Sequence, residues 1–325
     1  MTLAPEIQSL IDWGTTVSET YGSLALPELR EAIRDELDRE LRRQGVTVEP
    51  VAAKADQRIA VDDGDIGIRI FTPAGAGPHP LFVHFHGGGF VLGTIESIVN
   101  DAKCAHICRA AQCVVATIEY RLAPEYRFPT AADDCYAALR WTVRNDRRID
   151  IDPARVAVGG ESAGGNLAAA VSLMARDRGG PPLVLQVLEV PVTDISRGAN
   201  DHPSVALFGQ GYGLDRADMD FYAKEYLVDL AEGDNPYASP LLADDLVGVA
   251  PAHVITAEYD VLRDSGEAYA RRLEQAGVPT TLHRKLGHTH GSSVLWQTWE
   301  PAQEWMGDVV GALRQAFHMR EATVS

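Results

Sequence analysis

The feature that most constrains the fold is a glycine-rich turn at residues 159–165, which lies between a strand-like and a helix-like segment. The turn reads GGESAGG and contains the pattern G-x-S-x-G, with Ser162 at its centre. A sharp turn from strand to helix strains the backbone of the central serine, and flanking glycines let the chain fold back tightly. We therefore expect Ser162 to project at the N-terminus of a helix, where backbone N–H groups favour negative charge.

Strand and helix patterns alternate along most of the chain. The first 45 residues look helical, with Pro27 at a helix start and Gly45 at its end. Strands are expected at 58–61, 66–71, 81–85, 114–120, 155–158, 183–190, 253–257 and 280–285. The first two form a hairpin through Asp62-Asp63-Gly64, and helices are expected at 97–111, 131–145, 165–178, 264–276 and 301–317. This alternation predicts an α/β fold with a mostly parallel sheet and helices on both faces.

Two regions fall outside this alternation and are expected to cover the C-terminal edge of the sheet. Residues 1–45 carry a stripe of leucine and isoleucine at a spacing of four, with Trp13 and Tyr21 available to line a pocket. Residues 195–240 form a long insertion rich in glycine and aromatic residues, and such insertions are usually functional. We expect 46–194 and 241–325 to form the core between them. Asp264 and Glu267 resemble a capping box at the start of the next helix, which Gly277 ends.

The charge balance and the apolar runs exclude several classes of partner. The net charge of −17 argues against nucleic acid or an anionic membrane. The longest apolar run, 183–192, is interrupted by polar residues and is too short to span a bilayer. The N-terminus lacks the pattern of a signal peptide, so a cytoplasmic location is expected. The cysteines contain no C-x-x-C pair and are expected to be buried free thiols; they are Cys104, Cys108, Cys113 and Cys135.

A second glycine-rich motif supplies what a reactive serine requires. His86-Gly87-Gly88-Gly89-Phe90 directly follows an expected strand. Successive glycines let backbone N–H groups approach a bound carbonyl oxygen. We expect the N–H groups of Gly88, Gly89 and Ala163 to converge on that oxygen and to stabilise the charge that develops on it.

A serine nucleophile also needs a histidine base and an acid that orients the base. If the chain order is serine, acid, histidine, both partners follow Ser162. His253 and His283 lie in expected strands, His202 lies in the insertion and His318 lies in the C-terminal tail. The remaining histidines, His288 and His290, lie in a loop after the last strand. Asp260 follows an expected strand and suits the role of the acid, and Glu258, inside that strand, is a second candidate.

Five motifs in a fixed order carry a resemblance to a known family. They are HGGGF at 86–90, YRLAPE at 120–125, GESAGG at 160–165, AEYDVLRD at 257–264 and HG at 290–291. The chain resembles the bacterial hormone-sensitive-lipase-like carboxylesterases of the α/β-hydrolase fold. The resemblance implies an eight-stranded sheet, a catalytic core, and a helical cap built from 1–45 and 195–240. It implies Ser162 as nucleophile, Asp260 as acid and His290 as base, with no metal or cofactor and with a small-molecule ester of short to medium chain length as substrate.

One position departs from the family pattern, and several roles stay open. Ser292 follows His290-Gly291 where the family usually has phenylalanine, so His288 remains an alternative base. In the other motifs, we expect Arg121 and Glu125 to form a buried, paired scaffold, His86 to hold the glycine loop and Glu161 to position loops. An amide-cleaving hydrolase and a non-catalytic small-molecule receptor remain alternative functions, and the chain is compatible with a homodimer.

Overall fold

The computed structural model describes residues 3–318, and its centre is one eight-stranded sheet. The strands are β1 (Ala53–Val61), β2 (Gly64–Thr72), β3 (His79–Phe85), β4 (Val114–Glu119), β5 (Ile151–Glu161), β6 (Leu185–Glu189), β7 (Ala252–Tyr259) and β8 (Thr280–Thr289). Their order is β1-β2-β4-β3-β5-β6-β7-β8, in which β2 runs antiparallel to both neighbours and all other pairs are parallel. The predicted hairpin and the mostly parallel sheet are confirmed.

Helices cover both faces of this sheet, as the alternation predicts. The helices of the core are α3 (Ile98–Ala111), α4 (Thr130–Arg144), the short α5 (Asp146–Ile149), α6 (Ala163–Asp177), α9 (Arg263–Gln275) and α10 (Glu300–His318). Apolar residues of α3 and α10 share one cluster with Phe82 and Val187 of the sheet, whereas those of α4, α6 and α9 share another with Leu81 and Val83. Because side chains alternate along a strand, neighbouring residues of β3 reach opposite helical layers.

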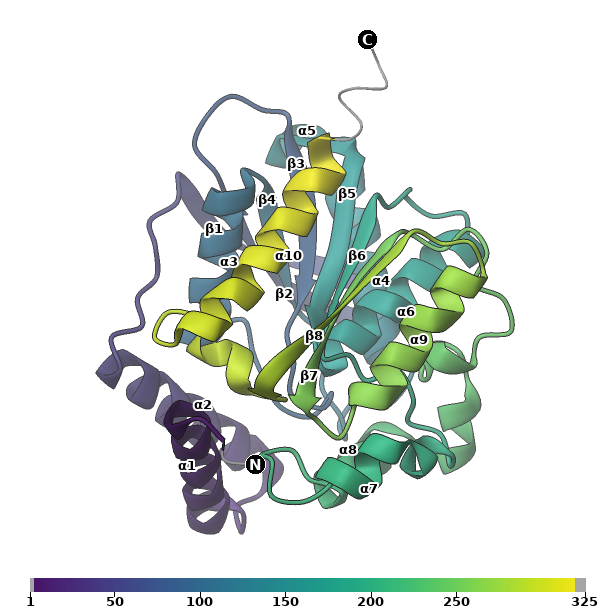
Figure 1. Ribbon diagram of the computed structural model, residues 1–325. Coiled ribbons are helices and arrows are strands. Elements are labelled where there is room, and N and C mark those ends of the chain that lie inside the picture. Colours follow the sequence, from purple (N-terminus) through teal and green to yellow (C-terminus); the bar gives the residue numbers. More distant parts are fainter. Residues whose placement is uncertain (1–2, 319–325) are drawn as a thin grey trace.

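The remaining helices gather at one end of the sheet. They are α1 (Pro5–Tyr21), α2 (Leu26–Arg43), α7 (Pro203–Phe208) and α8 (Arg216–Tyr226), and they lie beyond the ends toward which the β7 and β8 arrows point (Figure 1). Arg30 of α2 donates to the carbonyls of Val91 and Ala123, 2.7 and 2.6 Å away. Arg127 donates to the carbonyls of Lys224 and Leu227, at the C-terminal end of α8. Helix α2 and the C-terminal end of α8 are thereby both held to loops of the core.

Two local expectations are wrong. Helix α9 begins at Arg263, its N-cap Leu262 has no capping side chain, and so Asp264 and Glu267 form no capping box. Glu267 instead binds Arg284 of β8, because its carboxylate finds a cation on the neighbouring strand. Strand β8 also runs to Thr289, so His288 lies within the strand and not in a following loop. The expected helix ends at Gly45 and Gly277 hold, and both glycines have positive φ.

The four cysteines are buried free thiols, as expected. Cys104 and Cys108 lie on α3 and pack in the cluster between that helix and the sheet. Within residues 3–318, no helix is both long and apolar enough to cross a membrane.

Candidate active site

Ser162 lies at a strained turn between β5 and α6. Strand β5 ends at Glu161, helix α6 begins at Ala163, and Ser162 between them has φ 56° and ψ −117°. A Cβ atom on Gly160 would lie 2.2 Å from the carbonyl oxygen of Phe85, and one on Gly164 would lie 2.0 Å from the same atom. Only glycine permits this close approach to β3 of the strand-to-helix turn at 160–164, which we call the elbow. The strain is held by backbone hydrogen bonds: the Ser162 N–H donates to the Glu189 carbonyl, 2.9 Å away.

His290 lies between Ser162 and Asp260. Its Nε2 is 2.9 Å from the Ser162 Oγ, and its Nδ1 is 2.9 Å from Oδ2 of Asp260. The other carboxylate oxygen of Asp260 accepts the N–H of Leu262, which fixes the orientation of the carboxylate. Asp260 directly follows β7 and His290 directly follows β8, so the parallel strands deliver both residues to the edge where Ser162 projects.

The surroundings of His290 favour its protonated form. Burial by itself would lower the pKa of His290, but the charge of Asp260, its hydrogen bond and the charge of Glu161 together raise the pKa above its ordinary value. An imidazolium that forms when His290 takes a proton from Ser162 is therefore stabilised where it forms.

The alternative base and the alternative acid have other partners. Nδ1 of His288 lies 2.8 Å from Oγ of Ser292, and the His288 ring packs against Trp299 and Trp305. Burial lowers the pKa of His288 to about 4. The Glu258 carboxylate accepts the N–H of Gly287 at 2.7 Å. Both residues fix the backbone that leads to His290, and neither is placed beside Ser162.

The other histidines after Ser162 also have structural partners. His253 lies 2.6 Å from the Thr281 hydroxyl, and His283 lies 2.9 Å from Asp308. His202, at the start of α7, lies 3.0 Å from Asp194. His318 is the last residue of α10.

The HGGGF loop lies beside the serine elbow. Gly88 and Gly89 have φ of 120° and 61°, conformations that favour glycine, and Gly89 lines the same cavity as Ser162. Ala163 is the first residue of α6, so its N–H group belongs to the helix terminus next to Ser162. Gly89 and Ala163, two of the predicted donors, thus lie next to Ser162, and Gly88 directly precedes Gly89 in the same loop. His86 holds the loop as expected: its Nδ1 lies 2.8 Å from the Gly87 carbonyl, and its ring stacks on Tyr120.

The expected pairing of Arg121 with Glu125 is wrong. Arg121 binds Asp134 of α4, with Nη2 2.7 Å from Oδ1. Glu125 binds Arg30 of α2, and its side chain is 42 % exposed. The YRLAPE motif at 120–125 therefore contacts two different helices, α4 through Arg121 and α2 through Glu125, and forms no ion pair between its own two charged residues.

A cavity of about 20 Å³ adjoins Ser162, roughly the room that one water molecule needs. Its lining is apolar apart from the serine and one phenol, and comprises Gly89, Phe90, Ser162, Val192, Ile195, Leu214, Met219, Tyr222 and Ala223. Trp13 and Tyr21, which the sequence offered as pocket residues, are not among them. The Tyr222 ring lies against Gly89, since a Cβ there would be 2.4 Å from Cγ of Tyr222.

Sequence reasoning missed the residues of α8 that face Ser162. The insertion 195–240 is rich in aromatic residues, but only the packing of α8 shows that Met219 and Tyr222 face the serine. It also missed the role of Ser292 and the buried Lys103, which binds the carboxylates of Glu161 and Glu189. One feature of the sequence could have indicated this cluster: Lys103 and Glu189 are charged residues inside a helix and a strand that were both predicted to pack in the core.

A serine on a strand-to-helix elbow, within this sheet order, defines the class of the α/β-hydrolases. A family model of the alpha/beta hydrolase fold matches residues 82–293. An arylesterase of Saccharolobus solfataricus is 41 % identical over 293 residues, which cover 89 % of this chain and 92 % of that protein. An ethyl acetate hydrolase of Pseudomonas putida is 36 % identical over 277 residues, covering 82 % and 86 %.

A solved structure supports the same family assignment. The hyperthermophilic esterase from the archaeon Pyrobaculum calidifontis matches with a TM-score of 0.89 and 32 % identity, covering 97 % of this chain and 99 % of that one. The chain belongs to the hormone-sensitive-lipase-like family of the α/β-hydrolase fold and is a carboxylic ester hydrolase.

Proposed function

We propose that the protein hydrolyses short- to medium-chain carboxylic esters through a Ser162–His290–Asp260 triad and an acyl-enzyme intermediate. The observation that carries the proposal is the position of His290, whose two ring nitrogens each lie 2.9 Å from a partner, Ser162 on one side and Asp260 on the other. This arrangement lets His290 take the serine proton while Asp260 steadies the resulting imidazolium.

The reaction then proceeds in two acyl-transfer steps. Ser162 Oγ attacks the ester carbonyl carbon, and the oxyanion of the tetrahedral intermediate is held by the N–H groups of Gly88, Gly89 and Ala163. His290 returns the proton to the leaving alcohol, and water repeats the sequence on the acyl-enzyme. The positive φ angles of Gly88 and Gly89, and the place of Ala163 at the start of α6, support this assignment of the donors.

The covering helices support the choice of substrate. We propose that residues 1–45 and 195–240 act as a cap on a catalytic core of 46–194 and 241–325. The cavity beside Ser162 is small and apolar, and its outer wall is formed by residues 214–223. A short acyl chain needs little displacement of that wall, whereas a longer one has to move Met219 and Tyr222. This favours small esters over long-chain lipids.

Hydrolysis of a series of p-nitrophenyl esters, from acetate to palmitate, tests the proposal with the wild type and Ser162→Ala. We expect turnover to peak at short or medium chains and to fall at least ~10³-fold in the variant. Mass spectrometry of the protein trapped with a phosphonate inhibitor gives a second readout, with the adduct on Ser162. Undiminished turnover in Ser162→Ala refutes the triad, and a maximum at palmitate refutes the chain-length preference.

A further inference from the structure

A buried lysine lies behind the nucleophile elbow. Lys103, on α3, has a side chain only 5 % exposed. Its Nζ is 2.5 Å from Oε2 of Glu161 and 2.8 Å from Oε1 of Glu189. The other oxygen of Glu189 accepts the indole N–H of Trp305, 2.8 Å away on α10. Buried charges are costly unless they are paired and hydrogen-bonded, and this ammonium and its two carboxylates meet that condition.

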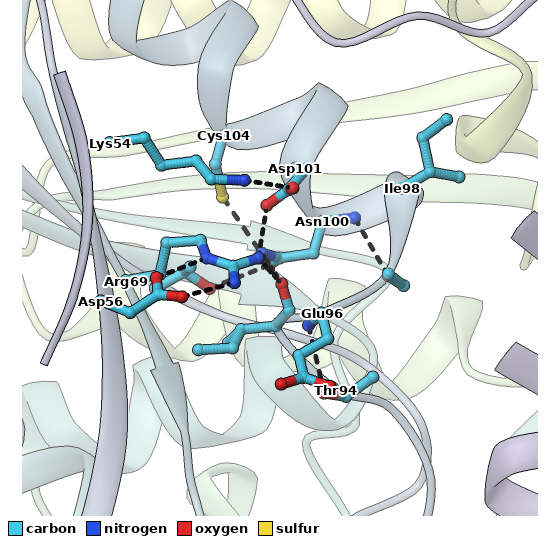
Figure 2. A network of polar contacts seen from close by, with 12 residues as sticks. Lys54, Asp56, Arg69, Thr94, Glu96, Ile98, Asn100, Asp101 and Cys104 are labelled. Atoms are coloured by element: carbon cyan, nitrogen blue, oxygen red, sulfur yellow. Dashed lines mark hydrogen bonds and ion pairs between the residues drawn. The ribbon is translucent and has the colours of Figure 1, made fainter. Parts of the chain in front are cut away.

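A second polar network fixes α3, which carries the lysine. Arg69 of β2 makes two hydrogen bonds to Asp56 of β1 and one to Asp101 in the first turn of α3 (Figure 2). Asn100 and Arg69 also share the carbonyl oxygen of Ile95, just before the helix. These contacts hold the start of α3 two residues before Lys103, so the helix presents the ammonium to the elbow from a fixed position.

Glu161 contacts both halves of the reaction site. It directly precedes Ser162, and its side chain packs against the backbone of Gly87, where an added Cβ would lie 3.1 Å from Glu161 Cγ. Glu189 adds a second tie, because its carbonyl accepts the Ser162 N–H. The cluster thus joins the serine elbow, the end of β6 and the glycine loop.

We infer that Glu161, held by Lys103, is a positioning residue that fixes Ser162 and the Gly87–Gly89 loop relative to each other. It also places a negative charge next in the chain to the serine whose hydroxyl lies 2.9 Å from Nε2 of His290. The inference rests on the proposed function, since it concerns the same serine chemistry. Glu161 does not exchange a proton with the substrate. It acts through the backbone on either side and through its charge.

The electrostatics of the cluster agree with this role. Burial would raise the pKa of Glu161, but the Lys103 charge and hydrogen bond lower it to about 2, so the residue stays ionised. The other titratable groups that interact with the charge of Glu161 are His84 and His86 on the β3 side, Cys104 on α3, Tyr120 after β4 and Glu189 on β6. Burial lowers the pKa of His84 to about 3, which keeps that ring neutral. The charged groups that face His290 are Asp260 and Glu161.

The variant Glu161→Gln tests the inference because it keeps the size of the side chain and removes its charge. We expect kcat to fall roughly 10- to 100-fold with KM within about threefold, since the reacting groups lose alignment. The acidic limb of the kcat/KM profile should move to lower pH by roughly half a unit, because His290 loses a facing negative charge. A carboxylate with only a structural role would leave that limb in place.

A double-mutant cycle tests whether Lys103 acts through Glu161. Lys103→Met should lower kcat as much as Glu161→Gln or more, and combining the two should cost little beyond the worse single variant. Glu49→Gln is the matched control, because Glu49, in the segment between α2 and β1, also holds a cation, Arg109 of α3, but its side chain is 31 % exposed. Its kinetics and pH profile should equal those of the wild type.

The outcomes separate this inference from the proposed function. If turnover does not depend on Ser162, the proposed function is refuted, regardless of the kinetics of Glu161→Gln. Ser162-dependent turnover with an unchanged kcat and an unmoved acidic limb in Glu161→Gln overturns only the positioning role, as does full additivity in the cycle. If Glu161→Gln fails to fold, the double variant, which lacks both charges, is assayed for the same pH shift.

Discussion

The hydroxyl of Ser292 and the Nδ1 of His288 are 2.8 Å apart in the core of the protein. Ser292 Oγ also donates to the Thr289 carbonyl, so its oxygen is free to accept a hydrogen bond from an N–H group at Nδ1 of His288. The ring of His288 is thereby held against Trp299 and Trp305. A small hydroxyl at 292, where the family usually has phenylalanine, binds one of two neighbouring histidines and leaves the other for Ser162.

The two histidines should respond differently to replacement. His290→Ala should lower kcat/KM for p-nitrophenyl butyrate at least ~10³-fold, as removal of a triad base does. His288→Ala should keep kcat/KM within about tenfold but lower the free energy of unfolding by roughly 1–3 kcal/mol, because it leaves a cavity and removes the hydrogen bond between His288 and Ser292. Urea unfolding measures the second effect. Equal loss of activity in both variants contradicts the assignment.

Restoring phenylalanine at position 292 should harm this protein. Ser292 is fully buried, so Ser292→Phe forces a large ring into filled space and should cost about 1–3 kcal/mol. Ser292→Ala, the control, removes the hydrogen bonds to His288 and to the Thr289 carbonyl without adding bulk, and should cost about 1 kcal/mol. Thermal unfolding of the two variants measures the difference. A stabilised Ser292→Phe would show that the loop repacks freely around the ring.

The pH dependence of turnover should report His290. In the proposed mechanism the neutral imidazole is the base, so kcat/KM should rise with pH as His290 loses its proton. Because Asp260 raises the pKa of His290 above 6.5, the midpoint of this rise should lie above 6.5. Asp260→Asn removes the charge, so it should shift the midpoint to lower pH and reduce kcat by up to ~10⁴-fold. Initial rates between pH 5 and 9 test both statements, and an unshifted midpoint in Asp260→Asn rejects them.

The elbow should tolerate no side chain at position 160. A methyl group there meets the Phe85 carbonyl at 2.2 Å, so Gly160→Ala should destabilise the protein by several kcal/mol, roughly 2–4, and abolish turnover. Gly311→Ala is the matched control, since a Cβ at this position in α10 meets nothing within 4 Å. It should stabilise the protein by about 0.5–1 kcal/mol through helix propensity. Calorimetry of both variants checks the contrast.

The cavity wall predicts a change in chain-length preference. Tyr222→Ala removes the ring that packs on Gly89 and enlarges the space beside Ser162. The preferred p-nitrophenyl ester should become longer by two or more carbons, with acetate hydrolysed more slowly because it fills the space less well. Phe221→Ala, next along α8 and 42 % exposed, lies outside the cavity lining and should leave the preference unchanged. An identical profile in all three proteins rules out Tyr222 as part of the acyl pocket.

Much of the fold was predictable because local sequence patterns specify the strands and helices. The eight strands and the five long helices packed on the sheet follow from hydrophobic periodicity and from turn residues, and each lies within a few residues of its predicted place. The errors lie where a long-range contact replaced a local one. Glu267 looked like part of a capping box but binds Arg284, and Arg121 and Glu125 looked like partners but bind separate helices.

The candidate site divides in the same way. Ser162, Asp260, Gly88 and Gly89 were predictable because each lies at a strand end, where parallel topology brings residues to one edge. The choice between His288 and His290 was not, because both lie within three residues and only packing shows which ring points to the serine. The ammonium of Lys103 between Glu161 and Glu189 joins residues from three elements, and no spacing in the sequence indicates it.

The sequence by itself determined the order of strands and helices, the elbow that strains Ser162 and the glycines that let the backbone pass close to it. These depend on interactions between residues near in the chain, which sequence patterns record. The tertiary structure alone decided which histidine reaches Ser162, which face of α8 closes the cavity and which charges are neutralised beneath the elbow. These depend on side chains distant in the sequence, whose directions are set only when the helices pack against the sheet.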